Sequence, residues 1–167
     1  MTNDEHESSA HQPEPDQGMT GTQPFVDSSS RGAAELAEKY LALWNEPDPD
    51  RRRGMIAELW TQDAMHFVQP PQEIRAIAAQ PGIGLTAILE ARGHEEIEAR
   101  VASAYEHWVG SEGLSFRRRD DAEQLGDVLK FHWEALDKDG ELFAVGLHVL
   151  VLAADGRIER DYTFVGA

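Results

Sequence analysis

One titratable side chain interrupts the most hydrophobic run of the sequence, and its chemistry suits proton transfer. His148 is the only ionisable residue in 142–152, where it stands between Leu147 and Val149. A buried imidazole that is neutral near pH 7 can accept or release a proton, as a general base or acid must. The alternative is a core histidine that is hydrogen-bonded to a neighbour, and the sequence leaves both interpretations open.

Asp161 and Tyr40 are the other candidates for a catalytic role. Asp161 and Thr163 share one face of a strand, and counting through the preceding turn places Thr163 or its neighbour opposite His148. Asp161 could therefore orient His148 or act as the acid or base itself, unless it is a surface carboxylate. Tyr40 lies on an apolar helical stripe, where a tyrosine is usually part of the core with its hydroxyl hydrogen-bonded.

Two more histidines alternate with apolar residues on predicted strands. We predict that His66 and His132 reach a pocket, although a half-solvated strand face is the more ordinary explanation of His132. A metal triad with His148 can be drawn, but no His-x-x-x-His spacing supports it, and we predict no metal. The chain has no Cys, which excludes thiol nucleophiles and Cys-ligated metals. It also lacks a glycine-rich phosphate loop, so we predict no cofactor.

The end of the chain predicts the sheet that must hold these side chains. Three strand-like runs over 128–165 are separated by Lys138-Asp139-Gly140 and by Asp155-Gly156. An Asp-Gly pair between two such runs is a strong hairpin signal. The sequence therefore predicts an antiparallel meander.

The earlier part of the chain must cover the apolar face of this meander. Apolar residues at helical spacing predict a helix over 33–44, a short helix capped by Asp48 or Asp50, and a long helix over 94–109. The other predicted elements are a helical piece over 72–79 and strands over 64–68, 85–92 and 114–119. Helices gathered on one side of such a sheet give an α+β fold of two layers.

Composition limits the possible partners and locations. With 167 residues and a net charge of −16, the chain has the size of one domain and is a poor match for nucleic acid. No apolar run reaches the roughly 18–20 residues of a membrane span, and the acidic start is unlike a signal peptide. We predict a disordered acidic tail over 1–31, a single domain over 32–167 and a cytoplasmic location. The preference for arginine over lysine suggests a bacterial source rich in G and C.

Three stretches of the sequence carry a family resemblance: residues 40–45 (YLALWN), residues 59–64 (LWTQDA), and Asp155-Gly156-Arg157-Ile158 followed by Tyr162-Thr163-Phe164. Over about residues 33–166 the chain resembles the nuclear-transport-factor-2-like proteins, specifically the SnoaL-like polyketide cyclases and the ketosteroid-isomerase-like proteins. The resemblance implies a cone, in which a curved mixed or antiparallel sheet wraps around a pocket and helices cover its concave side. It also implies a homodimer formed through the outer face of the sheet.

The resemblance assigns roles to particular positions. In the isomerase branch a helix tyrosine, here Tyr40, donates to the developing oxyanion, and a neutral acid on a late strand is matched here by His148. The general-base aspartate of that branch is matched by Val68, so isomerisation by that route is not expected. The SnoaL-like cyclases suggest a simpler plan, in which one acid/base residue on the late strands promotes an intramolecular aldol closure.

We therefore predict a hydrophobic pocket for a small apolar metabolite, with His148, Asp161 and Tyr40 as catalytic residues. The residues predicted to line the pocket are Trp44, Trp60, His66, Val68, His132 and Trp133. The expected chemistry is cyclisation, isomerisation or dehydration next to a carbonyl, without a cofactor. The alternative is a non-catalytic binding or assembly module, which a pocket filled by side chains or a broad apolar outer sheet face would favour.

Overall fold

The computed structural model describes residues 28–70, 72, 75–76 and 89–166. The predicted tail over 1–31 lies outside these residues except for 28–31, which belong to the first helix rather than to a tail. Most of the predicted helical piece over 72–79, and the part of the predicted strand before Leu89, also lie outside them.

Helices form at the predicted places with shifted ends. They are α1 (Ser28–Asn45), α2 (Pro49–Leu59), α4 (Gly93–Ala104) and the π-helix η1 (Tyr105–Ser111). Helix α1 begins five residues before the predicted start, because serines are well tolerated in a first helical turn. Asp48 caps α2 by accepting hydrogen bonds from the backbone N–H groups of Asp50 and Arg51. The predicted helix over 94–109 is wrong in its last part, where wider π turns replace the α-helix.

The strands form one mixed sheet in the described part of the chain. They are β1 (Trp60–Val68), β2 (Leu89–Arg92), β3 (Ser115–Arg118), β4 (Glu123–Leu125), β5 (Val128–Leu136), β6 (Leu142–Leu152) and β7 (Ile158–Val165). Their order is β2-β1-β7-β6-β5-β3, with β4 also paired to β5. The meander of β5, β6 and β7 is confirmed as antiparallel, and only the pairing of β1 with β7 is parallel.

Two strands differ from their prediction. Residues 123–125, which lie outside the predicted strands, form β4. Strand β1 begins at Trp60 rather than at Ala64. Its extra residues include the polar Thr61, Gln62 and Asp63, which fall where the pairing of β1 with β7 is interrupted between Trp60 and Met65. A strand segment without regular pairing lacks the alternation by which strands are recognised.

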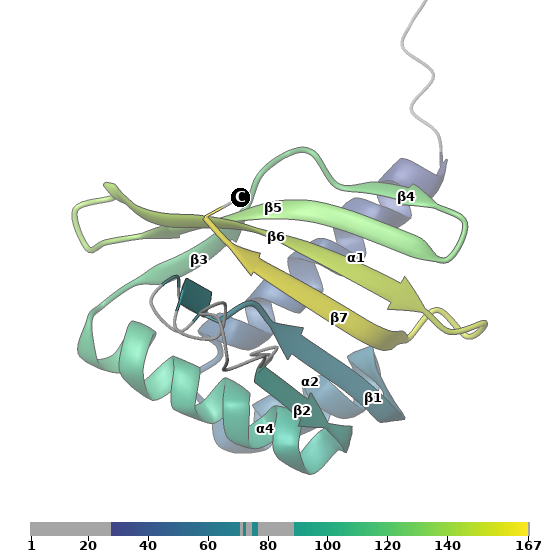
Figure 1. Cartoon of the computed structure of the whole chain (residues 1–167), viewed down its shortest axis with the longest axis horizontal. Helices are drawn as coiled ribbons and strands as arrows, with labels where there is room; N and C mark the ends of the chain where they lie inside the picture. Colours follow the sequence, from purple (N-terminus) through teal and green to yellow (C-terminus); the bar gives the residue numbers. More distant parts are fainter. Residues whose placement is uncertain (1–27, 71, 73–74, 77–88, 167) are drawn as a thin grey trace, which may run out of the picture.

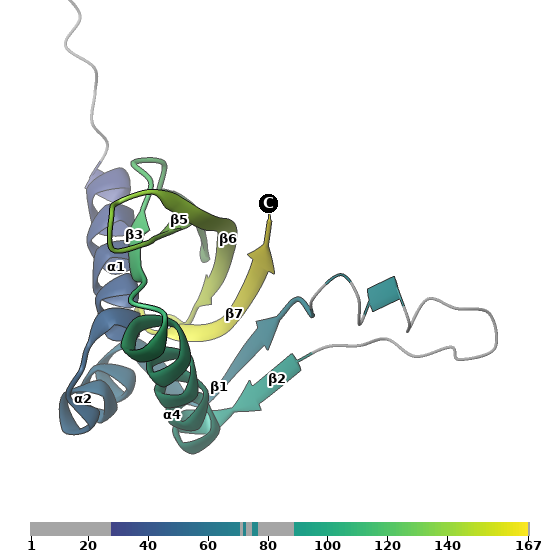
Figure 2. The ribbon, with the colours of Figure 1, turned by 90° about the vertical axis from the view of Figure 1, so that its left-hand side faces the viewer.

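The sheet is strongly curved, and helices cover its concave side. Figure 1 shows the outer face of β5, β6 and β7 with α1 behind them. Figure 2 shows the same strands curling around an interior that α1 and α4 close. The predicted α+β cone is therefore confirmed. At Gly146 of β6, a Cβ atom would lie 2.3 Å from the carbonyl oxygen of Phe164 and 2.4 Å from ring carbons of Trp133, so the close approach of Trp133 requires glycine.

Among the helices that the structure describes, none is both long and apolar enough to span a membrane.

Candidate active site

A cavity of about 240 Å³ opens on the concave side of the sheet. Its walls are mostly apolar, and they come from α1, α4, η1 and five strands. The lining residues are Leu41, Trp44, His66, Val68, Arg100, Ala104, Trp108, Phe116, Trp133, His148 and Thr163. A pocket lined by apolar residues with a few converging polar groups is typical of a small-molecule site.

Asp161 lies behind the polar wall of this cavity and joins four side chains into one group. It is completely buried. Its Oδ1 lies 3.1 Å from Nδ1 of His148, and its Oδ2 lies 3.4 Å from Nε2 of His66 and accepts a hydrogen bond from the Tyr40 hydroxyl. The Thr163 hydroxyl lies 3.0 Å from Nδ1 of His148 and 3.2 Å from Nε2 of His66. Two imidazoles therefore share one buried carboxylate.

This environment keeps Asp161 ionised and Tyr40 protonated. Burial alone would raise the pKa of the Asp161 carboxyl, but the two imidazoles and the Tyr40 hydroxyl outweigh it and hold that pKa below its usual value. Burial, followed by the nearby Asp161 charge, raises the pKa of Tyr40 well above its usual value. Tyr40 therefore remains a hydrogen-bond donor to the carboxylate.

His66 is neutral at physiological pH. Burial lowers the pKa of His66 to about 4, because desolvation of the imidazolium outweighs the attraction of Asp161. The Asp161 carboxylate, 3.4 Å from Nε2, favours the tautomer that carries its proton on that nitrogen, because the N–H dipole then points toward the negative charge. Nδ1 of His66 is then a buried acceptor, and it has no hydrogen-bond partner in the part of the chain that the structure describes.

His148 is placed so that its second ring nitrogen can meet a ligand. An ionised Asp161 fixes the proton of His148 on Nδ1, where it donates to the carboxylate. The ring is 4 % exposed and lines the cavity, packed edge-on against Tyr40 with the ring centroids 4.6 Å apart. Its hydrogen bonds to described residues all use Nδ1. Nε2 is therefore the nitrogen left for a bound molecule, in the arrangement that makes a buried aspartate and histidine an effective base.

Strand register explains how the chain brings these groups together. His148 pairs with Thr163 across the β6–β7 hairpin, as predicted by counting through the turn. His66 pairs with Asp161 across the parallel β1–β7 contact, and Val68 pairs with Thr163 in the same way. Paired residues share a face of the sheet, so all of these side chains point to the concave side.

The structure places Asp161 and Tyr40 behind the cavity rather than in its wall. Both are fully buried, and neither lines the cavity. Of the two alternatives considered for Asp161, the geometry supports orientation of His148 rather than direct contact with a ligand. The Tyr40 hydroxyl faces Asp161, so it is not positioned to donate to an oxyanion in the cavity.

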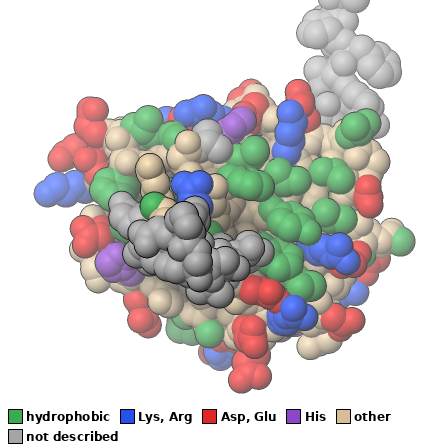
Figure 3. All heavy atoms as spheres, in the orientation of Figure 1, with side chains coloured by type: hydrophobic (Ala, Val, Ile, Leu, Met, Phe, Trp, Pro, Cys, Tyr) green, Lys and Arg blue, Asp and Glu red, His purple; other side chains and the backbone are tan. Residues whose placement is uncertain are grey.

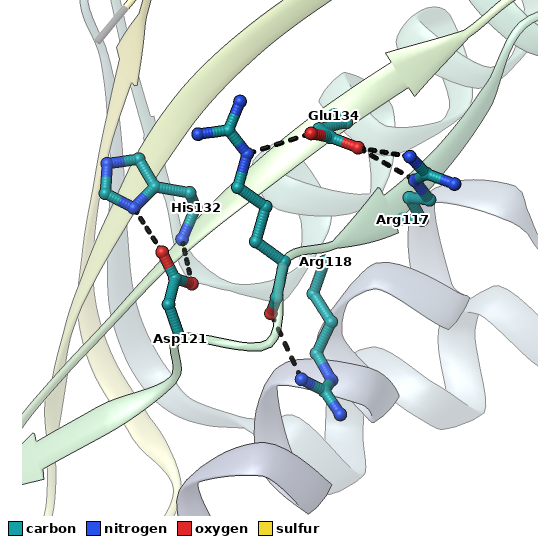
Figure 4. Close-up of polar contacts among 6 residues, drawn as sticks. Arg117, Arg118, Asp121, His132 and Glu134 are labelled. Carbon is teal, nitrogen blue, oxygen red and sulfur yellow. Dashed lines mark hydrogen bonds and ion pairs between the residues drawn. The ribbon is translucent and has the colours of Figure 1, made fainter.

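Four of the six predicted pocket residues line the cavity, namely Trp44, His66, Val68 and Trp133. Trp60 does not, because it packs behind the site, with its ring 5.9 Å from that of His66 and fully covered. His132 also does not, because the inward direction of Phe131 and Trp133 turns it to the outer face. There its Nδ1 lies 2.6 Å from Oδ2 of Asp121, as Figure 4 shows.

His66, His132 and His148, the three histidines considered as a metal triad, do not converge, because His132 lies on the other face of the sheet. Within the described residues, no group of three or more ligand-type side chains is arranged to hold a metal ion.

Arginine occurs in two runs, 51–53 and 117–119, and all of these side chains except Arg52 reach the surface. In the run 117–119, Arg117 and Arg119 both bind Glu134 (Figure 4). Arg52 instead is buried, donates to the carbonyl oxygen of Glu46 at 2.7 Å, and lies over the Tyr105 ring.

Sequence reasoning missed several lining residues. Four of them could have been predicted from their place on apolar faces: Leu41, Ala104 and Trp108 lie on the apolar stripes of predicted helices, and Phe116 lies on a predicted strand. No feature of the sequence predicts that Arg100 lines the cavity, because a charged residue on a helix is normally assigned to the solvent-exposed face.

Comparison with known proteins identifies the fold. Neither a protein-family model nor a curated protein matches the sequence. Among solved structures, a candidate isomerase of the SnoaL-like family from Agrobacterium tumefaciens superimposes with a TM-score of 0.65 at 23 % identity, covering 82 % of this chain and 99 % of that one.

Two further structures show the same likeness. A SnoaL-like protein of unknown function from Burkholderia thailandensis gives a TM-score of 0.55 at 16 % identity over 82 % of this chain and 97 % of that one. A protein with a ketosteroid-isomerase-like fold from Catenulispora acidiphila was solved in complex with trimethylamine. It superimposes with a TM-score of 0.51 at 16 % identity, covering 78 % of this chain and 84 % of that one. The chain therefore has the nuclear-transport-factor-2-like fold that SnoaL-like proteins share.

Proposed function

We propose that this protein binds a small apolar metabolite in the cavity and catalyses acid/base chemistry next to a carbonyl group of that molecule. The observation that carries the proposal is the convergence of two cavity-lining imidazoles on one buried carboxylate. The cavity is open rather than filled by side chains, which favours an enzyme over a passive module. The fold of the Agrobacterium tumefaciens candidate isomerase is consistent with this class of reaction.

In the proposed reaction, the first step falls to His148 with the support of Asp161. Nε2 of His148 removes a proton from the carbon beside the carbonyl, and the electron pair of that C–H bond moves onto the carbonyl oxygen. The resulting imidazolium is stabilised by Asp161, which the Tyr40 hydroxyl holds in place. The enolate can then take the imidazolium proton at another carbon, expel a β-hydroxyl group that takes this proton and leaves as water, or attack a second carbonyl whose oxygen takes it. These are the isomerisation, dehydration and cyclisation alternatives.

Removal of the His148 base should abolish proton abstraction without unfolding the protein. We expect the protein to accelerate deuterium exchange at the α-carbons of 2-tetralone, a two-ring ketone of suitable size, in D₂O followed by ¹H NMR. His148→Asn keeps a donor toward Asp161 and removes the base. It should lower the protein-dependent rate about 100-fold, the usual contribution of a general base.

His132→Asn is the matched control, because His132 lies on the outer face, and it should exchange at the wild-type rate. Exchange no faster than buffer with the wild-type protein, or equal rates for wild type and His148→Asn, would contradict the proposed function.

A second proposal concerns assembly. The outward-facing residues of β6 are Val145, Leu147, Val149 and Val151, and they adjoin Tyr162 and Phe164 of β7. Figure 3 shows hydrophobic side chains gathered over these strands. Phe164 is 39 % exposed, and a broad apolar patch of this kind favours a protein interface. We propose that two copies pair through this face; the same patch would serve a non-catalytic assembly module.

Light scattering at micromolar concentration should therefore give twice the chain mass of 18.6 kDa. Phe164→Lys should reduce it to one chain mass, because a lysine would place an unpaired charge in the interface. A single chain mass for the wild-type protein would rule out the dimer.

A further inference from the structure

Arg100 is the one described cavity residue whose side chain carries a permanent positive charge. It projects from α4, and it also borders a surface groove next to Glu90, Ala104 and Trp108. Its Nη2 donates to the backbone carbonyl oxygen of Glu90 at 3.1 Å. Arg100 therefore stands where the cavity meets the surface, with one guanidinium nitrogen tied to β2.

Among the described residues no carboxylate lies within ion-pair distance of Arg100, as is also true of the buried Arg52, which instead donates to the carbonyl oxygens of Glu46 and Pro47. Most other described arginines do have a carboxylate partner, for example Arg53 with Glu98 at 2.9 Å, Arg117 with Glu134 at 2.7 Å and Arg157 with Asp155 at 2.7 Å. The chain carries 31 acidic residues against 15 basic ones. A half-buried guanidinium without a carboxylate is therefore notable in this protein.

Its surroundings make that positive charge costly. Burial lowers the pKa of Arg100, since partial desolvation of the guanidinium outweighs the attraction of the Glu96 carboxylate one helical turn earlier. The Arg100 charge also contributes to the lowered pKa of His66, which shows that the two groups interact across the cavity wall. Guanidinium groups bind carboxylates through paired hydrogen bonds, and such contacts gain strength where water is excluded. The Nε1 group of Trp133, buried and without a partner among the described residues, is a further donor in the same wall.

We propose that the ligand of this cavity is an apolar carboxylate, whose carboxylate group is bound by Arg100 at the mouth while its apolar rings fill the interior. This inference rests on the proposed function and adds the substrate class. The carboxylate end is held at Arg100, and the reacting carbonyl faces His148 in the interior. Arg100 thereby acts as a specificity-determining residue, because a neutral analogue leaves its charge uncompensated.

Isothermal titration with two probes of equal size tests the inference. We expect 2-naphthoate to bind at least 10-fold more tightly than 2-naphthamide, which has the same rings without the charge. Arg100→Gln should remove this preference by weakening only the naphthoate, and Arg100→Lys should retain part of it. Arg157→Gln is the matched control, because it changes the net charge equally in an exposed turn, and it should keep the full preference.

The possible outcomes separate this inference from the proposed function. Equal binding of the two probes to the wild-type protein, or an unchanged preference in Arg100→Gln, would overturn the role of Arg100. Failure of 2-naphthoate to bind at millimolar concentration would also overturn it. Exchange on 2-tetralone, which carries no anionic group, would still stand as the separate measure of the His148 chemistry.

Discussion

Replacing Asp161 by leucine is expected to lower the free energy of unfolding by about 3–5 kcal/mol. The substitution leaves the Tyr40 hydroxyl and the two imidazoles without their shared acceptor inside the protein. A buried polar group without a partner costs about 1–3 kcal/mol, and the Thr163 hydroxyl can replace the lost acceptor for only one of the two imidazoles, so two such groups are left. Removal of the buried carboxylate returns part of this cost, because the charge itself was expensive to desolvate.

Urea denaturation at pH 7 measures this change, and Glu159→Leu is the control on the same strand. Glu159 is exposed on β7 and makes only a 3.8 Å contact with Arg160, so its replacement should change the free energy of unfolding by less than about 0.5 kcal/mol. Asp161→Asn keeps the shape and one acceptor oxygen, and should fall between the two. A loss below about 1 kcal/mol in Asp161→Leu would mean that Asp161 does not hold the site together.

Acidification from pH 7 to pH 4.5 is expected to remove about 2–3 kcal/mol of stability through His66 alone. The pKa of His66 is about 4 in the folded chain and about 6.5 in the unfolded chain. Between these values the unfolded state binds more protons than the native state, so stability falls as the pH is lowered. The loss begins near pH 6.5 and is complete only below pH 4. Asp161, whose pKa is lowered, contributes a loss only at still lower pH.

His66→Asn isolates this effect from the other titrating groups. The difference in unfolding free energy between wild type and variant should shrink by about 2–3 kcal/mol between pH 7 and pH 4.5, because the variant has no imidazole to protonate. NMR titration of the His66 ring should give a midpoint near 4. A midpoint near 6.5, or a difference that does not change with pH, would contradict the burial of a neutral His66.

Local patterns in the sequence were sufficient for the meander and for one contact of the site. The turns at Gly140 and Gly156 set the hairpins, and a hairpin register follows from turn chemistry within a few residues. The pairing of His148 with Thr163 was therefore predictable by counting. The inward direction of Phe131 and Trp133 followed from strand alternation, and the same alternation should have excluded His132 from the pocket.

The contact between His66 and Asp161 could not be predicted in this way, because 95 residues separate the two strand positions. The parallel pairing of β1 with β7 depends on how the whole sheet curves around α1 and α4, and no local signal specifies it. The same is true of the Tyr40 hydroxyl, which meets Asp161 from a helix 121 positions away in the chain.

The sequence by itself thus determined which side chains can transfer a proton and which strands carry them, since composition, periodicity and turn residues are local properties. Only the tertiary structure decided that Asp161 supports two imidazoles from behind, that Trp60 lies outside the cavity and that Arg100 stands at its mouth. The physical reason is that burial and desolvation, which set the charge of each group, arise from contacts between segments distant in the chain.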